Sequence, residues 1–394
     1  MVKHLFTLIW NKKKQNALLL SEILVSFLVL FAVFSMLVYF YHNYKKPAGF
    51  KCEQVWAVSY NQSFAESNTD SVVQYYDAVK QLLLSLPQVR SVSLASSNLP
   101  YFQRTIQYGI KQNAISVNNV NSYDIEDSYA AILGLQIMEG RWFDKSDITF
   151  KNKPIVINNS LKQRLFGNGK AIGELIGDGP DKDKRKVIGV VQDPKFDGDY
   201  TGAGLASFSR IDTGNIRWVG NMLIEVAPGA DAAFEAKLYK VLANSMKNGN
   251  VEIEYLTNKR KSINYFALVP MIILSIISSF LIVNVALGLF GVLWYNINKR
   301  RGEIGLRRAI GASGKSISVQ LVTESMLLAC LALMIGSFFA IQFPLLNVFD
   351  LPAGIYLSAL LLAIIFVYML VLVCSLYPGK QAAAIYPAAA LHED

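Results

Sequence analysis

Apolar residues form four long runs, and a segment of mixed character separates the first run from the second. The runs occupy residues 17–41, 263–295, 318–343 and 355–376. Each is as long as, or longer than, the roughly 20 residues that a helix needs to cross the hydrocarbon core of a bilayer. The pattern therefore predicts four transmembrane helices.

The second run is longer than one crossing requires. As a single helix, residues 263–295 would extend about 50 Å at 1.5 Å per residue, whereas the hydrocarbon core is about 30 Å thick. We therefore expect one of two things: part of this helix extends beyond the membrane as a stalk, or the helix bends near Pro270.

The segment between the first two runs, residues 42–262, alternates short β-like stretches with helical ones. This alternation is typical of a compact α+β domain. The predicted strands are Gln54–Tyr60, Val89–Leu94, Ile155–Ile157, Val187–Val191, Met222–Val226 and Val251–Tyr255. The predicted helices are Asp70–Leu86, Ser122–Leu133, Ser160–Phe166 and Ala230–Lys247. The expected fold is an α-helical membrane protein with this domain inserted between transmembrane helices 1 and 2.

Composition supports a mixed membrane and soluble architecture. The 394 residues are 53% hydrophobic and only 17% charged, and the mean hydropathy is +0.31. The net charge of +9 is unevenly placed, because residues 42–264 carry 27 basic against 23 acidic side chains. The other 11 basic residues flank the apolar runs. Such residues orient a membrane protein, so we do not expect nucleic acid as a partner.

The positions of these basic residues predict the topology. Lys and Arg next to apolar runs favour the cytoplasmic side, which assigns residues 1–16, 296–317 and 377–394 to the cytoplasm. The domain and a short loop, residues 344–354, are then extracytoplasmic, and that loop carries no Lys or Arg. The first run exceeds a signal-peptide core and lacks a small-residue cleavage site after it, so we expect it to be retained.

Candidate catalytic and metal-binding groups are sparse. Cys52 lies in the domain, Cys330 and Cys374 fall inside apolar runs, and the three histidines are scattered. This set offers neither a disulfide framework nor a metal site. We therefore expect no catalytic residues and no bound metal.

The most distinctive stretch is a polar island, residues 298–316, between the second and third runs. Lys299, Glu303 and Arg307 follow one another at i, i+4 spacing, as on a short amphipathic helix. Gly314, Lys315 and Ser316 resemble the end of a phosphate-binding loop, but Ala309 stands where that loop needs glycine; capping or a tight turn is the alternative. By physical argument alone, the island is equally compatible with a loop that fixes topology and a helix that docks a partner.

The stretch Arg300-Arg-Gly-Glu-Ile-Gly-Leu-Arg-Arg-Ala-Ile-Gly-Ala-Ser313 resembles the signature of the MacB/FtsX-type permeases of ABC transporters. Further similarities to that family lie in residues 133–143, 154–166, 187–193 and 377–391. Their order and spacing agree with the family over nearly the whole chain. The tail has fewer basic residues than the family commonly shows.

The resemblance implies a permease subunit in the bacterial cytoplasmic membrane that is not itself an enzyme. The sequence contains no nucleotide-binding domain, so we expect a separate cytoplasmic ABC ATPase that uses ATP, and no cofactor on this chain. Other implied partners are membrane lipid, a second permease chain in a homo- or heterodimer, and an extracytoplasmic substrate or adaptor. The expected role is to move a peptide, lipoprotein, antibiotic or other amphiphile. The alternative is a regulatory subunit that activates an external hydrolase or signals to a sensor kinase.

The resemblance also selects candidate site residues. The ATPase-coupling candidates are Arg300, Arg301, Glu303, Ile304, Leu306, Arg307, Arg308 and Ile310. Glu324, in the third run, matches a glutamate common in the family and is an intramembrane functional candidate. Its alternative role is to pair with an arginine of the island at the cytoplasmic boundary.

Overall fold

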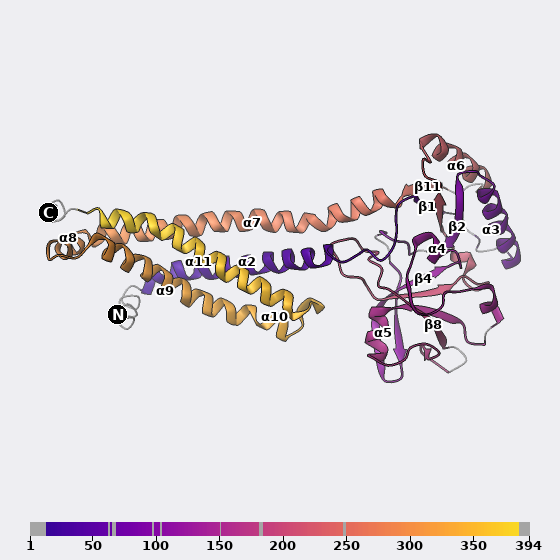
Figure 1. Cartoon of the computed structure of the whole chain (residues 1–394), viewed down its shortest axis with the longest axis horizontal. Coiled ribbons are helices and arrows are strands. Elements are labelled where there is room, and N and C mark those ends of the chain that lie inside the picture. Colours follow the sequence, from indigo (N-terminus) through magenta and orange to yellow (C-terminus); the bar gives the residue numbers. More distant parts are fainter. Residues whose placement is uncertain are drawn as a thin grey trace. The chain divides into compact units, whose positions relative to one another are not determined.

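The computed structural model describes residues 13–385 except 62, 63, 65–67, 97, 103, 104, 150, 181–183 and 247–249. The chain forms two compact units, one of Met1–His42 with Leu268–Asp394 and the other of Asn43–Ala267 (Figure 1). Most of the predicted N-terminal segment, residues 1–12, and the last nine residues of the predicted tail lie outside the described residues.

The first unit is helical and contains the four predicted spans. Four helices are long and apolar enough to cross a membrane; they are α2 (Lys13–Tyr44), α7 (Leu256–Lys299), α9 (Gly314–Ala340) and α11 (Ala353–Ala383). The short elements are α8 (Arg301–Ala309), α10 (Gln342–Leu345) and η3 (Val348–Asp350). Helix α7 is 44 residues long with Pro270 inside it, so it exceeds one crossing, as predicted.

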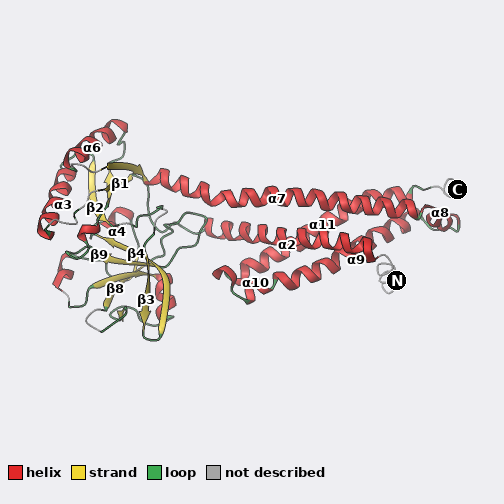
Figure 2. Ribbon diagram, turned by 180° about the vertical axis from the view of Figure 1, so that it is seen from behind, coloured by secondary structure: helices red, strands yellow, loops and turns green. Residues whose placement is uncertain are grey.

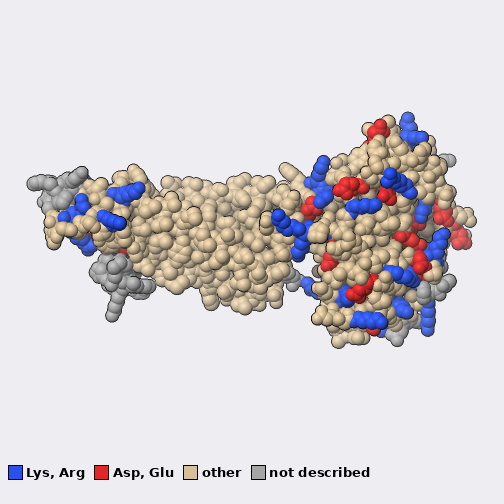
Figure 3. All heavy atoms as spheres, in the orientation of Figure 1, with Lys and Arg blue, Asp and Glu red and all other residues tan. Residues whose placement is uncertain are grey.

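Small residues allow the spans of this unit to pack closely. Ala329, Ala332, Ala359 and Ala363 are fully buried in the core that α2, α9 and α11 share, and Figure 2 shows α9 and α11 running side by side. In lipid, where the hydrophobic effect does not drive helices together, such close backbone approach is a main source of association energy. The basic residues of this unit gather around α8 on the face drawn in Figure 3.

The second unit is an α+β domain built on one mixed sheet. In the described residues the strand order is β11-β1-β10-β2-β4-β9-β6-β8-β5, with β3 paired to β4 and β7 to β8. The strands are β1 (Val55–Asn61), β2 (Val89–Ala95), β3 (Gln107–Gln112), β4 (Ile115–Ile125), β5 (Ile137–Gly140), β6 (Pro154–Asn158), β7 (Leu175–Ile176), β8 (Arg185–Val191), β9 (Ala206–Arg210), β10 (Asn221–Val226) and β11 (Asn250–Tyr255). The helices are α3 (Thr69–Leu84), α4 (Tyr129–Leu133), α5 (Asn159–Phe166), α6 (Ala232–Ser245), η1 (Lys145–Thr149) and η2 (Ile216–Trp218).

All six predicted strands are present, and three of the four predicted helices correspond to α3, α5 and α6. The predicted helix Ser122–Leu133 is wrong over its first part, because residues up to Ile125 belong to β4 and only Tyr129–Leu133 is helical. Tyr123 pairs in parallel register with Phe208 of β9, and this long-range pairing outweighs the local helical pattern.

Each half of the sheet has a core of its own, and a third core spans both halves. Helices α3 and α6 cover β11, β1, β10 and β2 (Figure 1) over one apolar core. Helix α5 packs near β6 and β8 over another. The halves meet where β2 pairs with β4 at Ala95 and Ile125. The third core, in which Leu223 of β10 is clustered with Phe208 of β9, joins the halves through side chains.

Asn158 connects the elements of the second half. It is fully buried, and its Nδ2 donates to Asp193 Oδ1 at 2.6 Å and to the Gly204 carbonyl at 2.9 Å. Its Oδ1 accepts from the backbone N–H groups of Leu161 and Ala206. One side chain therefore caps α5 and ties it to the segments that follow β8 and precede β9.

We predict that Asn158→Ala lowers the free energy of unfolding by about 2–4 kcal/mol, because it leaves several buried polar groups without partners. The matched control is Asn118→Ala, since Asn118 is exposed on β4, and its effect should stay within about 0.5 kcal/mol. Denaturant unfolding of the purified chain measures both. Equal stability of the two variants would contradict this role of Asn158.

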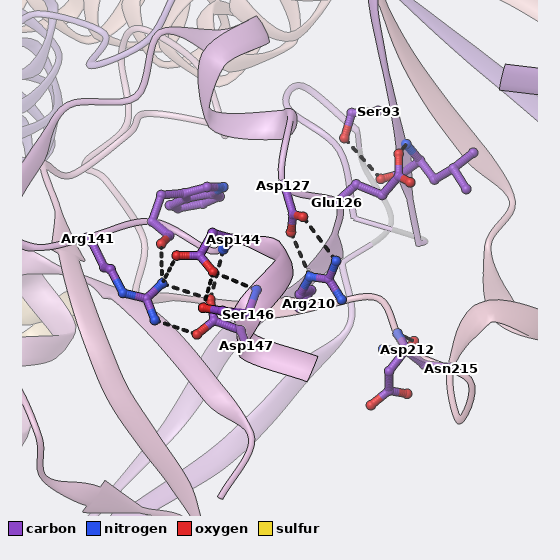
Figure 4. Close-up of polar contacts among 12 residues, drawn as sticks. Ser93, Glu126, Asp127, Arg141, Asp144, Ser146, Asp147, Arg210, Asp212 and Asn215 are labelled. Carbon is purple, nitrogen blue, oxygen red and sulfur yellow. Dashed lines mark hydrogen bonds and ion pairs between the residues drawn. The ribbon is translucent and has the colours of Figure 1, made fainter. Parts of the chain in front are cut away.

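Two ion pairs border a cleft of about 890 Å³ between the halves. Figure 4 shows Arg141 facing Asp144 and Asp147, and Arg210 facing Asp127. The buried Asp147 carboxylate accepts from Arg141 at 2.8 and 2.5 Å and from the Asp144 backbone N–H. The hydrogen bonds from Arg141 hold the pKa of Asp147 below its ordinary value of 3.8.

A lowered folded-state pKa means that the stabilisation by Asp147 is fully present above the unfolded-state value, near 3.8, and is lost as the pH falls through the lower folded value. We predict that Asp147→Asn destabilises the chain at neutral pH and flattens the loss of stability on acidification. Thermal unfolding between about pH 3 and pH 7 measures this. Asp77→Asn, at an exposed position of α3, is the control and should change the acid slope less. A native-like acid slope in Asp147→Asn would count against the assignment.

Candidate functional site

The polar island forms a short helix between two sharp turns. Helix α7 ends at Lys299, and Arg300 leaves the helical region before α8 begins at Arg301. Gly311, with φ of 104°, makes the turn after α8; only glycine adopts this conformation without strain. The Ser313 side chain then caps α9 by accepting from the Ser316 backbone N–H. The capping interpretation of this stretch is confirmed.

Four of the predicted residues, with Gln320, form a closed polar ring between α8 and α9. Arg300 lies 3.6 Å from both Glu303 and Glu324, and Glu303 accepts from Arg307 at 2.5 Å. Arg307 also donates to Gln320 at 3.2 Å, and Gln320 donates to Glu324 at the same distance. We call these five residues the α8–α9 ring.

The ring is shielded on one side and open on the other. The side chains of Arg300 and Glu324 are 17% and 20% exposed, whereas those of Glu303 and Arg307 are 45% and 44% exposed. Salt screens a shielded pair less than an exposed one, so Arg300–Glu324 is the firmer link. It joins the junction between α7 and α8 directly to α9. The predicted pairing of Glu324 with an arginine of the island is therefore present.

The apolar candidates divide into two groups. Ile304 is buried with Ile297, Ile317 and Leu321, so it holds α8 against its neighbours and is not free to dock a partner. Leu306 and Ile310 are 52% and 77% exposed. Of the three apolar candidates, only these two are therefore accessible on the surface of α8.

The two remaining arginines differ from the ring residues. Arg301 and Arg308 are half-buried, and the Nε of Arg308 has no hydrogen-bond partner among the described residues. Arg308 lies against Gly314, where an added Cβ would meet its Nη1 at 3.1 Å. Sequence reasoning missed Gln320, although its position four residues before Glu324 on one helix face was a usable signal.

No group of three or more His, Cys, Asp or Glu side chains that could hold a metal occurs among the described residues. The island holds charged and apolar groups on a short helix. The chain has the features of a membrane protein with a short helix between its second and third apolar helices and an inserted α+β domain.

Comparison with known proteins agrees with this class. The model of the MacB-like periplasmic core domain matches residues 21–240, and that of the FtsX-like permease C-terminal region matches residues 268–387. The chain therefore belongs to the family of MacB- and FtsX-like permeases, which are ABC-transporter permeases. The inserted domain is its extracytoplasmic domain.

Individual relatives are distant. The Macrolide export ATP-binding/permease protein MacB 1/2 of Paracoccus denitrificans is 23% identical over 72% of this chain and 42% of its own length. The uncharacterized ABC transporter permease YvrN of Bacillus subtilis is 24% identical over 68% of this chain and 69% of its own. The chain thus spans less than half of that MacB relative. The crystal structure of the periplasmic region of MacB from Actinobacillus actinomycetemcomitans is 16% identical, with a TM-score of 0.40, over 56% of this chain and 96% of that one.

We predict that Arg300→Ala lowers the melting temperature of the chain in detergent by a few degrees, because it removes the link from α8 to α9. Glu324→Gln should cost less, since glutamine can keep the hydrogen bond with Gln320. In a double-mutant cycle, Arg300→Ala should cost less in the Glu324→Gln background than in the native one, with a coupling of about 0.5–3 kcal/mol. Additive effects would show that the two side chains do not interact.

Proposed function

We propose that this chain is the transmitting subunit of an ABC transporter in the bacterial cytoplasmic membrane. A separate cytoplasmic ATPase uses ATP and binds α8, and the chain itself binds no cofactor. The observation that carries the proposal is the exposed pair Leu306 and Ile310 on a helix that the α8–α9 ring fastens to α9.

The connection of α7 to the extracytoplasmic domain supports transmission. Helix α7 begins at Leu256, directly after β11 ends at Tyr255, and it continues to Lys299, next to the ring residue Arg300. A helix of this length extends about 66 Å at 1.5 Å per residue. In the proposed mechanism, a displacement at the α8 end passes along this helix to a strand of the domain, although Pro270 removes one hydrogen bond from the ladder.

Thermodynamics sets a condition on such a mechanism. The ATPase can shift the chain between two arrangements only if it binds α8 with different affinity in each of them. In the proposed mechanism two permease chains and two ATPase chains act together. The extracytoplasmic domain then moves a peptide, lipoprotein, antibiotic or other amphiphile.

We predict that Leu306→Asp and Ile310→Asp abolish co-purification of the ATPase, because a carboxylate in a desolvated contact lacks a partner. Both side chains are exposed in the chain alone, so the fold should be kept. Tyr239→Asp, at a position 46% exposed on α6, makes a similar change away from α8 and should leave co-purification intact. Undiminished ATPase binding by both α8 variants would count against docking at this surface.

Charge reversal on the same helix gives a second prediction. Glu303→Arg and Arg307→Glu each break their shared ion pair and place a like charge beside the other, so each should prevent the ATPase from co-purifying. Lys186→Glu reverses a charge at an exposed position of β8 and is the control. The measurement is pull-down in mild detergent, followed by quantification of the ATPase. Normal recovery with either reversed residue would argue against the proposal.

A further inference from the structure

The loop after β8 contacts both helices that connect the extracytoplasmic domain to the membrane spans. All of these contacts lie within the unit Asn43–Ala267. Lys195 in this loop is only 3% exposed. Its Nζ donates to the carbonyl oxygens of Asn43 at 2.7 Å, Lys46 at 3.3 Å and Asp199 at 2.7 Å.

Two of these acceptors lie at the C-terminal end of α2, which ends at Tyr44. The last carbonyl groups of a helix have no partner within the helix, and the helix dipole places partial negative charge there. A lysine ammonium group donates hydrogen bonds to these carbonyl groups and also places a positive charge beside the partial negative charge of the helix end. Its three donors are used by three carbonyl groups, so the end of α2 is fastened to this loop.

Asp199 makes the corresponding contacts with α7. Its carboxylate accepts from Arg260 Nε at 3.0 Å and from Asn264 Nδ2 at 2.6 Å. Its backbone N–H donates back to Asn264 Oδ1 at 2.9 Å. Arg260 and Asn264 are four residues apart, and the loop therefore contacts one face of the first turns of α7.

Gly198, between Lys195 and Asp199, lies too close to α7 for a larger side chain. Gly198 has φ of 114°, and an added Cβ would lie 2.8 Å from Ile263 Cγ2. Beyond Asp199, the Tyr200 ring stacks on Tyr44 of α2 at 5.6 Å, and its carbonyl accepts from Asn43 Nδ2. The loop thus contacts α2 and α7 on consecutive residues.

Stability alone does not explain a buried lysine here. Burial lowers the pKa of Lys195, which shows that the charged form is partly desolvated. An apolar side chain of similar size would avoid that cost. The hydrogen bonds of Lys195 are directional, so they define one position for the end of α2 relative to the loop. Fully satisfied buried polar groups commonly specify a unique geometry in this way.

We propose that Lys195 and Asp199 are positioning residues that clamp the end of α2 and the start of α7 into one rigid body, so that the two helices cannot slide past each other inside the domain. The clamp rests on the proposed function for its use in transmission, but its existence is testable without the ATPase.

The first experiment uses the full chain without nucleotide. Spin labels are attached to cysteines that replace the exposed Lys46 and Lys261, and Cys330 and Cys374 are changed to alanine. Cys52 is kept, because its thiol is buried and burial raises its pKa. We expect one narrow distance distribution that widens roughly two-fold in Lys195→Met. Lys195→Arg, which retains donors, should restore much of the narrow distribution. Lys186→Met, an exposed position on β8, is the matched control.

Asn264→Ala keeps the experiment decisive if Lys195→Met does not fold, since it removes two hydrogen bonds on the α7 side and leaves the buried lysine in place. It should widen the distribution as well. A distribution as narrow as the native one in Lys195→Met, or in Asn264→Ala when the lysine variant is unfolded, would overturn the clamp.

The second experiment adds the ATPase and compares the nucleotide-free and ATP–vanadate states. In the native chain the distance between the labels should not change, whereas in Lys195→Met it should shift with nucleotide. A nucleotide-dependent shift in the native chain would overturn the clamp. If no ATPase associates with the native chain, the proposed function fails while the first experiment still decides whether the clamp exists.

Discussion

The backbone's need for hydrogen bonds in an apolar solvent is the constraint on which the rest of this structure depends. Four segments are too apolar to remain in water and must satisfy their own N–H and C=O groups, so they form helices. Charged groups are then confined to the ends of those helices, where water or other charges can reach them. The α8–α9 ring and the Lys195–Asp199 clamp are both arrangements of this kind.

The two polar arrangements share one element. Helix α7 carries Arg260 and Asn264 near its start, and the ring residue Arg300 follows its end. Both arrangements therefore lie next to one continuous helix, whose hydrogen-bond ladder lacks only the N–H of Pro270 within it. The ion pairs at both ends are partly shielded from solvent, and each joins the helix to a neighbouring segment. Their value lies in fixing geometry.

Much of the fold follows from local pattern. The buried strands β6 and β8 consist largely of consecutive apolar residues, which periodicity detects. Strand β4 was missed because its sequence, Ile-Ser-Val-Asn-Asn-Val-Asn-Ser-Tyr-Asp-Ile, is mostly polar, and its conformation depends on pairing with β3 and β9, the latter about 85 residues away in sequence. Likewise, α11 continues to Ala383, past the predicted boundary at 376, and the buried Pro378 and Gly379 pack within it.

The sequence by itself determined the four apolar helices and the inserted α+β domain, because hydropathy and residue periodicity act over a few turns of chain. Only the tertiary structure decided that Ile304 is buried while Leu306 and Ile310 are exposed, that Gln320 completes a ring with Glu324, and that Lys195 meets the end of α2 about 150 residues away. Those features depend on distances between segments that fold together, and no local pattern of residues encodes such distances.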